Sequence, residues 1–265
     1  LINPFFLSML GSITRACARQ GYDLLISFQQ LSDDWHADYQ DSHKADGLIL
    51  LGYGDYLVAR HKLEKLVEQD THFVRWGAVV PGQPGISVGC DNVQGGRAVT
   101  EHLLGLGRRR IAFVGDNTDH FPEFRDRYRG YVEALKGAGL VPDPRLQIEA
   151  IESTEQAGHR AVSTLLGRGH EFDALFAASD LLAIGAMHAL ADAGVRVPQD
   201  VSVVGFDDIP MASFANPALT TVVQDTKLAG EILVERLLRL IHGEAVQSSM
   251  LPAQVVVRRS CGAQR

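Results

Sequence analysis

The 265-residue sequence contains only three cysteines, Cys17, Cys90 and Cys261, which are far apart along the chain. An odd and scattered set favours no disulfide framework and suits a reducing compartment. No apolar run approaches the roughly 20 residues that cross a membrane, and no basic segment followed by an apolar one indicates a signal peptide. We therefore expect a cytoplasmic protein with no membrane partner.

Patterns typical of enzymes and metal sites are also missing. The ten histidines are dispersed, zinc-ligand spacing is absent, and neither a phosphate-binding loop nor Gly-x-Ser-x-Gly occurs. The run Gly52-Tyr53-Gly54 lacks the third glycine of a dinucleotide fingerprint and is interpreted as a tight turn. We expect no catalytic residues, no metal and no cofactor, which favours a binding protein over an enzyme.

The chain has little positive charge. It carries 25 Lys and Arg against 32 Asp and Glu, a formal net charge of −7. Because DNA phosphates attract basic surfaces, these residues as a whole should repel DNA. Any DNA binding would require a further segment.

What the chain does contain is a regular alternation of apolar runs of strand length with amphipathic segments of helix length. This alternation predicts an α/β fold of parallel sheets covered by helices. Strands are expected at 23–27, 47–51, 72–75, 86–88, 110–115, 147–151, 174–178 and 201–204. Helices are expected at 4–20, 34–44, 56–69, 93–106, 125–138, 154–167, 181–193 and 228–242. The length is sufficient for two cores of about 100–150 residues each.

The segment 197–208 is the most informative about function. A proline and a turn lead into a buried strand, which ends in Gly205, Phe206, Asp207 and Asp208. Ligands bind at the carboxyl ends of strands in open α/β sheets, so these carboxylates are placed to accept hydrogen bonds from one. The alternative is an ordinary strand followed by a helix-capping aspartate.

Further motifs support the functional interpretation. In chain order they are Asn3-Pro4-Phe5-Phe6, Cys90-Asp91-Asn92, Arg127-Tyr128-Arg129-Gly130-Tyr131, Ala178-Ser179-Asp180 and Leu219-Thr220-Thr221-Val222. Together with segment 197–208, this ordered set resembles the sugar-sensing domain of LacI/GalR-type transcription regulators over essentially the whole chain. Family members carry a helix-turn-helix, a hinge helix and a first strand before the Asn-Pro segment. Since these are missing, we expect the chain to be part of a longer regulator that binds operator DNA through a missing N-terminal domain.

The resemblance implies a two-lobed, periplasmic-binding-protein-like fold. Each lobe would be a parallel sheet flanked by helices, and three hinge crossings would join the lobes near residues 106–109, 222–225 and 250–253. The N-terminal lobe would comprise 1–107 plus 224–250, and the C-terminal lobe 108–223 plus 251–265. The effector would bind in the cleft between the lobes.

The resemblance also implies ligand-binding residues. Arg127 and Asp207 match the family's two charged contacts, and Phe5 and Phe6 match its apolar contacts. The further polar positions are Asn92, Ser179 and Gln224. Additional candidates, at places where this chain departs from better-known members, are Trp76, His120 and Ser153.

Structural roles remain as alternatives for several of these residues. Arg127 could form a surface salt bridge, and Asn92 could only cap the helix that follows it. Phe6 and Trp76 could belong to the core.

The function implied is that of an effector-binding and dimerisation domain of a sugar-responsive bacterial regulator, expected to act as a repressor. Its partners would be a mono- or disaccharide and a second copy of the chain. The homodimer is expected to pair mainly through the first lobe, where helix 56–69 carries Leu57, Val58, Leu63 and Leu66. A periplasmic sugar-binding protein and an α/β enzyme acting on a sugar or nucleotide remain as alternatives, although the run Val-Pro-Gln-Asp-Val-Ser at 197–202 favours the regulator.

Overall fold

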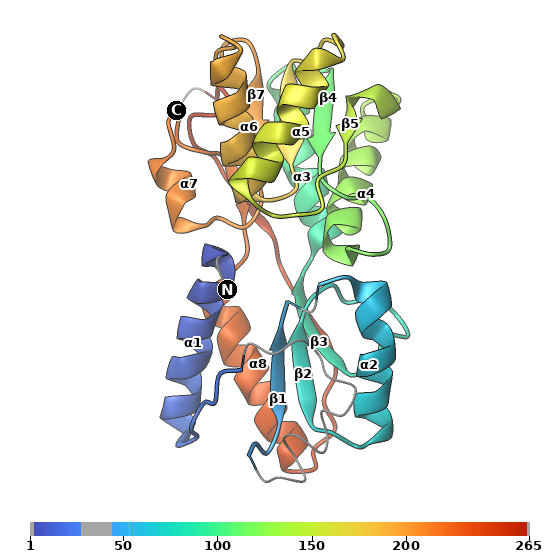
Figure 1. Cartoon of the computed structure of the whole chain (residues 1–265), viewed down its shortest axis with the longest axis vertical. Coiled ribbons are helices and arrows are strands. Elements are labelled where there is room, and N and C mark those ends of the chain that lie inside the picture. The colour runs from blue at the N-terminus through green and yellow to red at the C-terminus, as the bar shows by residue number, and fades with distance from the viewer. Residues whose placement is uncertain (1–2, 28–43, 53, 264–265) are drawn as a thin grey trace. The chain divides into compact units, whose positions relative to one another are not determined.

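The structure is a computed structural model, and it describes residues 3–27, 44–52 and 54–263. The chain forms two compact units (Figure 1). The first unit comprises Leu1–Cys90 and Asp225–Leu251, and the second comprises Asp91–Gln224 and Pro252–Arg265. The chain therefore passes from one unit to the other after Cys90, Gln224 and Leu251.

The first unit is built on a parallel four-stranded sheet in the order β1-β2-β3-β9. Its strands are β1 (Leu48–Leu51), β2 (Phe73–Trp76), β3 (Ile86–Cys90) and β9 (Ser249–Leu251). The helices are α1 (Pro4–Gln20), α2 (Tyr56–Glu68) and α8 (Thr226–Ile241). Apolar side chains of β1, α2 and β2 form one buried cluster, so the core lies between this sheet and its helices.

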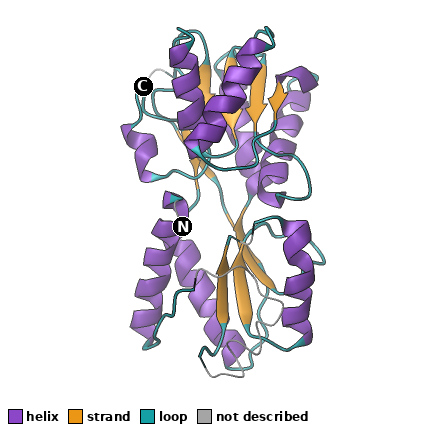
Figure 2. Cartoon of the chain, in the orientation of Figure 1, coloured by secondary structure: helices purple, strands orange, loops and turns teal. Residues whose placement is uncertain are grey.

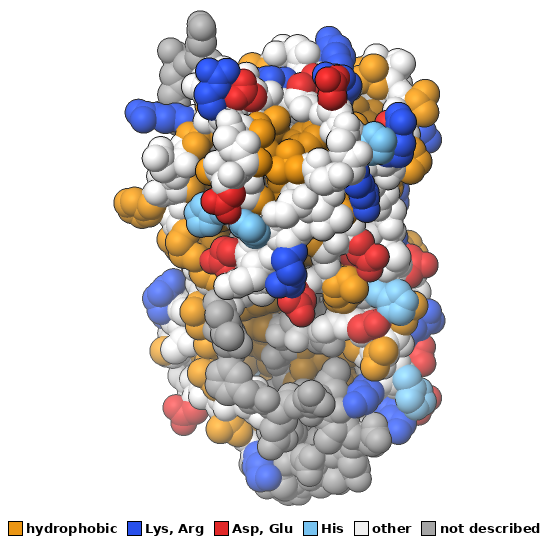
Figure 3. Space-filling view, turned by 45° about the horizontal axis from the view of Figure 1, so that its top comes forward, with side chains coloured by type: hydrophobic (Ala, Val, Ile, Leu, Met, Phe, Trp, Pro, Cys, Tyr) orange, Lys and Arg blue, Asp and Glu red, His pale blue; other side chains and the backbone are white. Residues whose placement is uncertain are grey.

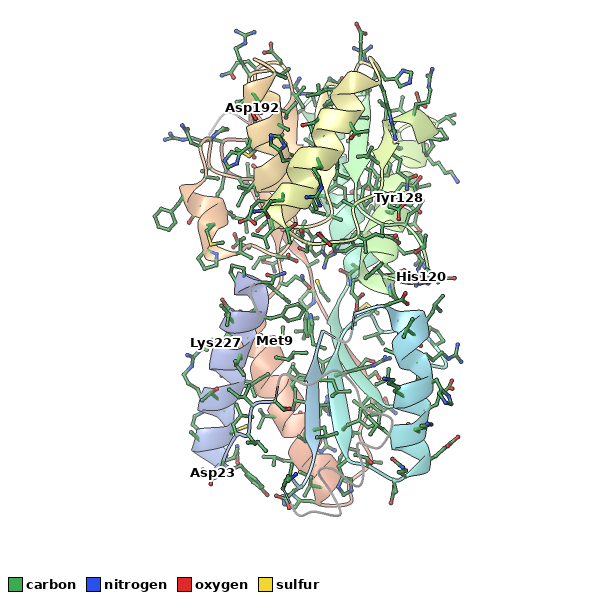
Figure 4. The ribbon with its side chains drawn as sticks, in the orientation of Figure 1. Met9, Asp23, His120, Tyr128, Asp192 and Lys227 are labelled. Atoms are coloured by element: carbon green, nitrogen blue, oxygen red, sulfur yellow. The ribbon has the colours of Figure 1, made fainter. Side chains whose placement is uncertain are left out.

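Helix α1 begins as its sequence predicts. The Asn3 side chain accepts a hydrogen bond from the Phe5 amide, and Pro4 occupies the first turn, where no N–H donor is needed. Met9, on the buried face of α1, and Lys227, on α8, lie on neighbouring helices in Figure 4. The Ser12 hydroxyl donates to the Lys227 carbonyl at 2.7 Å, which fixes the two helices to each other.

The second unit is built on a parallel sheet in the order β5-β4-β6-β7 (Figure 2). The strands are β4 (Ile111–Val114), β5 (Gln147–Ile148), β6 (Ala174–Ala177) and β7 (Ser202–Val204). The helices are α3 (Asn92–Gly105), α4 (Pro122–Gly137), α5 (Glu155–Gly167), α6 (Asp180–Asp192) and α7 (Pro210–Phe214). An antiparallel pair, β8 (Thr221–Val223) and β10 (Gln254–Val256), completes the unit. Isolated bridges join Thr220, just before β8, to Val204 and join Val223 of β8 to Asp207.

Helices α3 and α4 pack closely because a glycine stands at their contact. A Cβ atom added to Gly96 on α3 would lie 2.2 Å from the carbonyl oxygen of Arg127 on α4. No side chain fits at that distance from a backbone atom. Only a glycine at position 96 therefore lets α3 lie this close to the backbone of Arg127.

The structure confirms the predicted α/β class and most of the expected elements. Strand β5 is shorter than expected, and residues 22–27 have no regular secondary structure, so the strand predicted at 23–27 is wrong. The helix predicted at 34–44 lies almost wholly outside the described residues. Residues 91–107, predicted for the first lobe, belong to the second unit, because α3 packs on α4. Among the described residues, no helix is long and apolar enough to cross a membrane.

The helix contact gives a prediction about stability. We expect Gly96→Ala to lower the free energy of unfolding by about 1–3 kcal/mol, because the methyl group forces α3 and α4 apart. The matched control is Gly105→Ala in the same helix, where nothing lies within 4 Å of an added Cβ atom. That control should change stability by less than about 1 kcal/mol in either direction. Urea unfolding of the two variants checks this, and equal stabilities would contradict it.

Candidate ligand-binding site

Polar side chains gather at one edge of the second-unit sheet, where its strands end. Asp116 follows β4, Ser179 and Asp180 follow β6, and Asp207 follows β7. Because the strands are parallel, their carboxyl ends meet at this edge, which is the usual place for a ligand in an open α/β sheet. The four side chains are buried, with exposed fractions of 7% or less.

Arg127, in the first half of α4, is the central cation of this edge. Its Nε atom donates to Asn92 Oδ1 at 2.8 Å, and its Nη1 atom donates to the Ala178 carbonyl at 2.5 Å. The guanidinium carbon lies 3.8 Å from the centroid of the Phe206 ring, a stacked cation–π arrangement. Arg127 is only 4% exposed, so the alternative of a surface salt bridge is wrong.

Asp207 is the anion that faces this arginine. Its Oδ1 atom lies 3.5 Å from Arg127 Nη1 and accepts a 2.6 Å hydrogen bond from Gln224 Nε2. Its backbone amide donates to the Val222 carbonyl on β8. Burial raises the pKa of Asp207 to about 6, while the Arg127 charge and the Gln224 hydrogen bond lower the pKa toward its usual range.

Each member of this charged pair keeps one hydrogen-bonding atom unused. Arg127 Nη2 and Asp207 Oδ2 make no hydrogen bond with any described residue. Neither atom is among the fully buried polar atoms without a partner, so both reach solvent. The pair therefore offers one donor and one acceptor to a bound molecule.

The remaining polar candidates of the second unit lie in or beside this network. Asn92 accepts from Arg127, and the cap of α3 is Asp91, so the alternative of a simple cap at Asn92 is wrong. Ser179 caps α6 through the Leu182 amide and accepts a 2.7 Å hydrogen bond from the Ser153 hydroxyl. His120 lies on the exposed loop before α4. Figure 4 labels His120 and also Tyr128, which lies on α4 itself.

The apolar candidates belong to the first unit. Phe5 lies with its ring centroid 5.4 Å from that of Phe6 and 5.9 Å from that of Trp76. Phe5 and Trp76 are buried, whereas Phe6 is only partly buried, and its ring would lie 3.3 Å from a Cβ atom added to Gly52. The buried face of α1 therefore runs through Phe5 rather than Phe6, and the core role considered for Trp76 fits its 6% exposure.

Sequence reasoning missed three participants in the network. Phe206 supplies the face on which Arg127 stacks, Phe124 lies 5.4 Å from the same guanidinium, and Asp180 binds the turn that carries Asp207. Phe206 directly precedes Asp207, and Phe124 lies three residues before Arg127 in the first turn of α4, so proximity in sequence to the charged residues was an available signal. Asp180 was noted only as the last residue of the run Ala178-Ser179-Asp180, and that pattern assigned it no role of its own.

The charge of the molecular surface agrees with the composition. On the face drawn in Figure 3, the coloured Lys and Arg side chains are interspersed with Asp and Glu. They form no basic stripe there of the kind that binds nucleic acid.

Comparison with known proteins identifies the family. A family model described as a periplasmic binding protein-like domain matches residues 100–261. The HTH-type transcriptional regulator CelR of Thermobifida fusca is 31% identical over 264 residues, which cover 97% of this chain and 76% of the relative. The chain belongs to the LacI/GalR family of transcriptional regulators.

Two solved structures of such regulators carry sugars. The chain is similar to a CelR–cellobiose complex with a TM-score of 0.87 and 31% identity, covering 97% of this chain and 79% of the other. It is also similar to a LacI-family regulator of Enterococcus faecium with bound ribose, with a TM-score of 0.82 and 25% identity, covering 98% and 95% of the two chains. The similarity extends over the sequence of both units.

The raised pKa of Asp207 predicts how stability depends on pH. A carboxyl with a folded-state pKa near 6 binds a proton more tightly than in the unfolded chain, so its stabilising contribution is present at acid pH and is lost as the pH rises through 6. From pH 5 to pH 7 this contribution should fall by about 1 kcal/mol in the native protein and not in Asp207→Asn. Urea unfolding at pH 5, 6 and 7 measures the difference. Parallel pH profiles for the two proteins would contradict it.

Proposed function

We propose that this chain is the effector-binding domain of a sugar-responsive transcription regulator, and that a mono- or disaccharide binds at the carboxyl edge of the second-unit sheet. The observation that carries the proposal is the buried Arg127–Asp207 pair with one free donor and one free acceptor. The regulator acts in the cytoplasm as a repressor and reaches operator DNA through a helix-turn-helix outside these 265 residues.

The chemistry of the pair suits a sugar. Neighbouring hydroxyl groups each donate and accept hydrogen bonds, so one can accept from Arg127 Nη2 while the next donates to Asp207 Oδ2. Hydrogen bonds to charged groups are about twice as strong as neutral ones, which gives a small uncharged ligand enough affinity. Asn92, Ser179 and Gln224, and more peripherally Ser153 and His120, are proposed as the polar surroundings. Phe5, Phe6 and Trp76 stay predictions for the apolar contacts.

Two other functions fit this fold less well. A periplasmic sugar-binding protein shares the binding chemistry, but the relatives that match nearly the whole chain are transcriptional regulators. For an enzyme, the relatives reported above give no support, since each is a transcriptional regulator. Incubation with candidate sugars and product analysis tests the enzyme directly.

The ligand class can be tested by melting. A sugar at about 100 times its dissociation constant adds about 2.7 kcal/mol to the free energy of unfolding. We expect at least one member of a panel of mono- and disaccharides, cellobiose and ribose included, to raise the melting temperature of the native chain. A panel without any effect would contradict the proposed ligand class.

The charged pair should carry most of the affinity for that sugar. Removing one charged hydrogen-bond partner costs about 1.5–3 kcal/mol, so Arg127→Ala and Asp207→Asn should each weaken binding by roughly tenfold to over a hundredfold. Calorimetry measures the affinities, and Arg110→Ala, an exposed arginine of the same unit that pairs with Glu171, is the matched control. Unchanged affinity in both Arg127→Ala and Asp207→Asn would show that these two side chains do not bind the sugar.

The same pair should make binding sensitive to acid. Because the ligand hydroxyl donates to the ionised carboxylate, affinity should be about tenfold weaker at pH 5 than at pH 7 for a pKa near 6. Asp207→Asn should bind weakly at both pH values. A flat pH profile for the native protein would show that Asp207 does not accept a hydrogen bond from the sugar.

We also propose that the chain is a homodimer, because a two-fold operator is matched by a two-fold protein. Leu63 and Leu66 of α2 are buried in their own unit, so the helix offers only Leu57 and Val58, 46% and 67% exposed, together with Val67 to a partner. The second unit exposes Phe214 of α7 by 87%, a surface that the sequence did not indicate. Pairing through the first unit stays the primary expectation.

Sedimentation at micromolar concentration should show a dimer. Val58→Asp should dissociate it while leaving the sugar-induced melting shift intact, and Phe214→Asp is the matched substitution on the other unit. A native monomer would contradict the homodimer, and dissociation by Phe214→Asp alone would move the interface to the second unit.

A further inference from the structure

Asp180, the first residue of α6, is a charged residue type with no exposed surface. Its Oδ2 atom accepts a 2.9 Å hydrogen bond from the Ile209 amide, and its Oδ1 atom lies 2.5 Å from the Thr221 hydroxyl on β8. Its own amide donates to the Phe206 carbonyl at 2.7 Å. One residue thus holds both ends of the turn 206–209 and fixes that turn to the neighbouring strand.

The turn that Asp180 holds has an unfavourable backbone. Asp207 has a φ of 121° and Asp208 a φ of 56°, values that residues with a side chain rarely adopt. Such conformations persist only where the surroundings fix them. Besides Asp180, the fixing contacts are the hydrogen bond from the Asp207 amide to Val222 and the 2.7 Å ion pair between Asp208 and Arg258.

The chain also makes room for this carboxyl group. A Cβ atom at Gly205 would lie 2.3 Å from Asp180 Oδ1, so only glycine permits the carboxyl group to reach the turn. Gly205, the Asp180 carboxyl group and the turn 206–209 therefore depend on one another, and together they set the position of the Asp207 side chain.

The surroundings of Asp180 favour its neutral form. The charged groups that face it are Asp207 and Asp208, which pair with Arg127 and Arg258. Burial, and then the charge of Asp207, raise the pKa of Asp180 well above its usual range. A neutral carboxylic acid donates one hydrogen bond and accepts another, which is also what an asparagine side chain does. Asparagine should therefore replace Asp180 with little loss.

We propose that Asp180 is a positioning residue for effector binding, which touches no ligand itself but fixes the turn 206–209 from which Asp207 reaches the sugar. The expected effect of Asp180 on sugar affinity rests on the proposed function. The hold on the turn is a property of the protein alone and can be measured without a ligand.

The ligand-free test is amide hydrogen exchange of the full chain, followed at residues 206–209. Asp180→Ala should speed exchange of the Asp207 and Ile209 amides at least tenfold, whereas Asp180→Asn should leave it within about threefold. Ser202→Ala is the matched control, since it removes a buried hydrogen bond to the Cys261 carbonyl in the same unit without touching the turn. Unchanged exchange in Asp180→Ala would overturn the inference.

The second test is calorimetry with cellobiose and with ribose. For whichever sugar the native protein binds, Asp180→Ala should weaken affinity about tenfold or more, Asp180→Asn should restore it to within about threefold, and Ser202→Ala should lower the melting temperature without changing affinity. If Asp180→Ala does not fold, Thr221→Val removes one of the two side-chain bonds and should give a loss of about threefold to tenfold.

The outcomes separate the two proposals. Binding of neither sugar by the native protein counts against the ligand chemistry chosen for the proposed function, while the exchange experiment still decides whether Asp180 holds the turn. Faster exchange with native affinity in Asp180→Ala would overturn the positioning role. Equal losses of affinity in Asp180→Asn and Asp180→Ala would also overturn the positioning role. The role assigns the effect to hydrogen bonds that an asparagine side chain can form, so Asp180→Asn should then retain affinity.

Discussion

A guanidinium stacked on a phenyl ring and facing a carboxylate is the interaction on which the second unit depends. Arg127 and Asp207 are 4% and 7% exposed, and burying such charges costs several kcal/mol each unless partners replace their water. Asn92, Gln224, the Ala178 carbonyl and the Phe206 ring are those partners. They come from four separate segments of the chain, so an arrangement that satisfies the pair also fixes α3, α4, β6 and β8 around it.

Close backbone packing makes this arrangement possible. Gly96 lets α3 approach the carbonyl of Arg127, and Gly205 lets the Asp180 carboxyl group approach the turn before Asp207. In both places a missing side chain on one segment sets the position of a charged side chain on another. The geometry of the site therefore depends on residues that no ligand touches.

The fold class could be predicted from the sequence because apolar patterns of helix and strand length mark nearly every element from α1 to α8. It also singled out Arg127, Asp207, Asn92 and Gln224 as candidates, and the structure joins these four side chains in one hydrogen-bonded network. It could not tell Phe5 from Phe6 as the buried aromatic, since both flank the same helical stripe and only packing decides. Asp180 was missed for a similar reason: its role follows from contacts with residues 29 and 41 positions away.

The two amide partners of the charged pair occupy special places in the chain. Asn92 is the second residue after the chain enters the second unit, and Gln224 is the last residue before it leaves. Any molecule that binds Arg127 Nη2 and Asp207 Oδ2 therefore contacts side chains whose other hydrogen bonds go to residues at two of the three passages between the units. Thermodynamic linkage makes such a coupling reciprocal. If the sugar shifts the conformation at those passages, then whatever favours one conformation there, operator DNA included, changes the affinity for the sugar by the same factor by which the sugar changes the affinity for it.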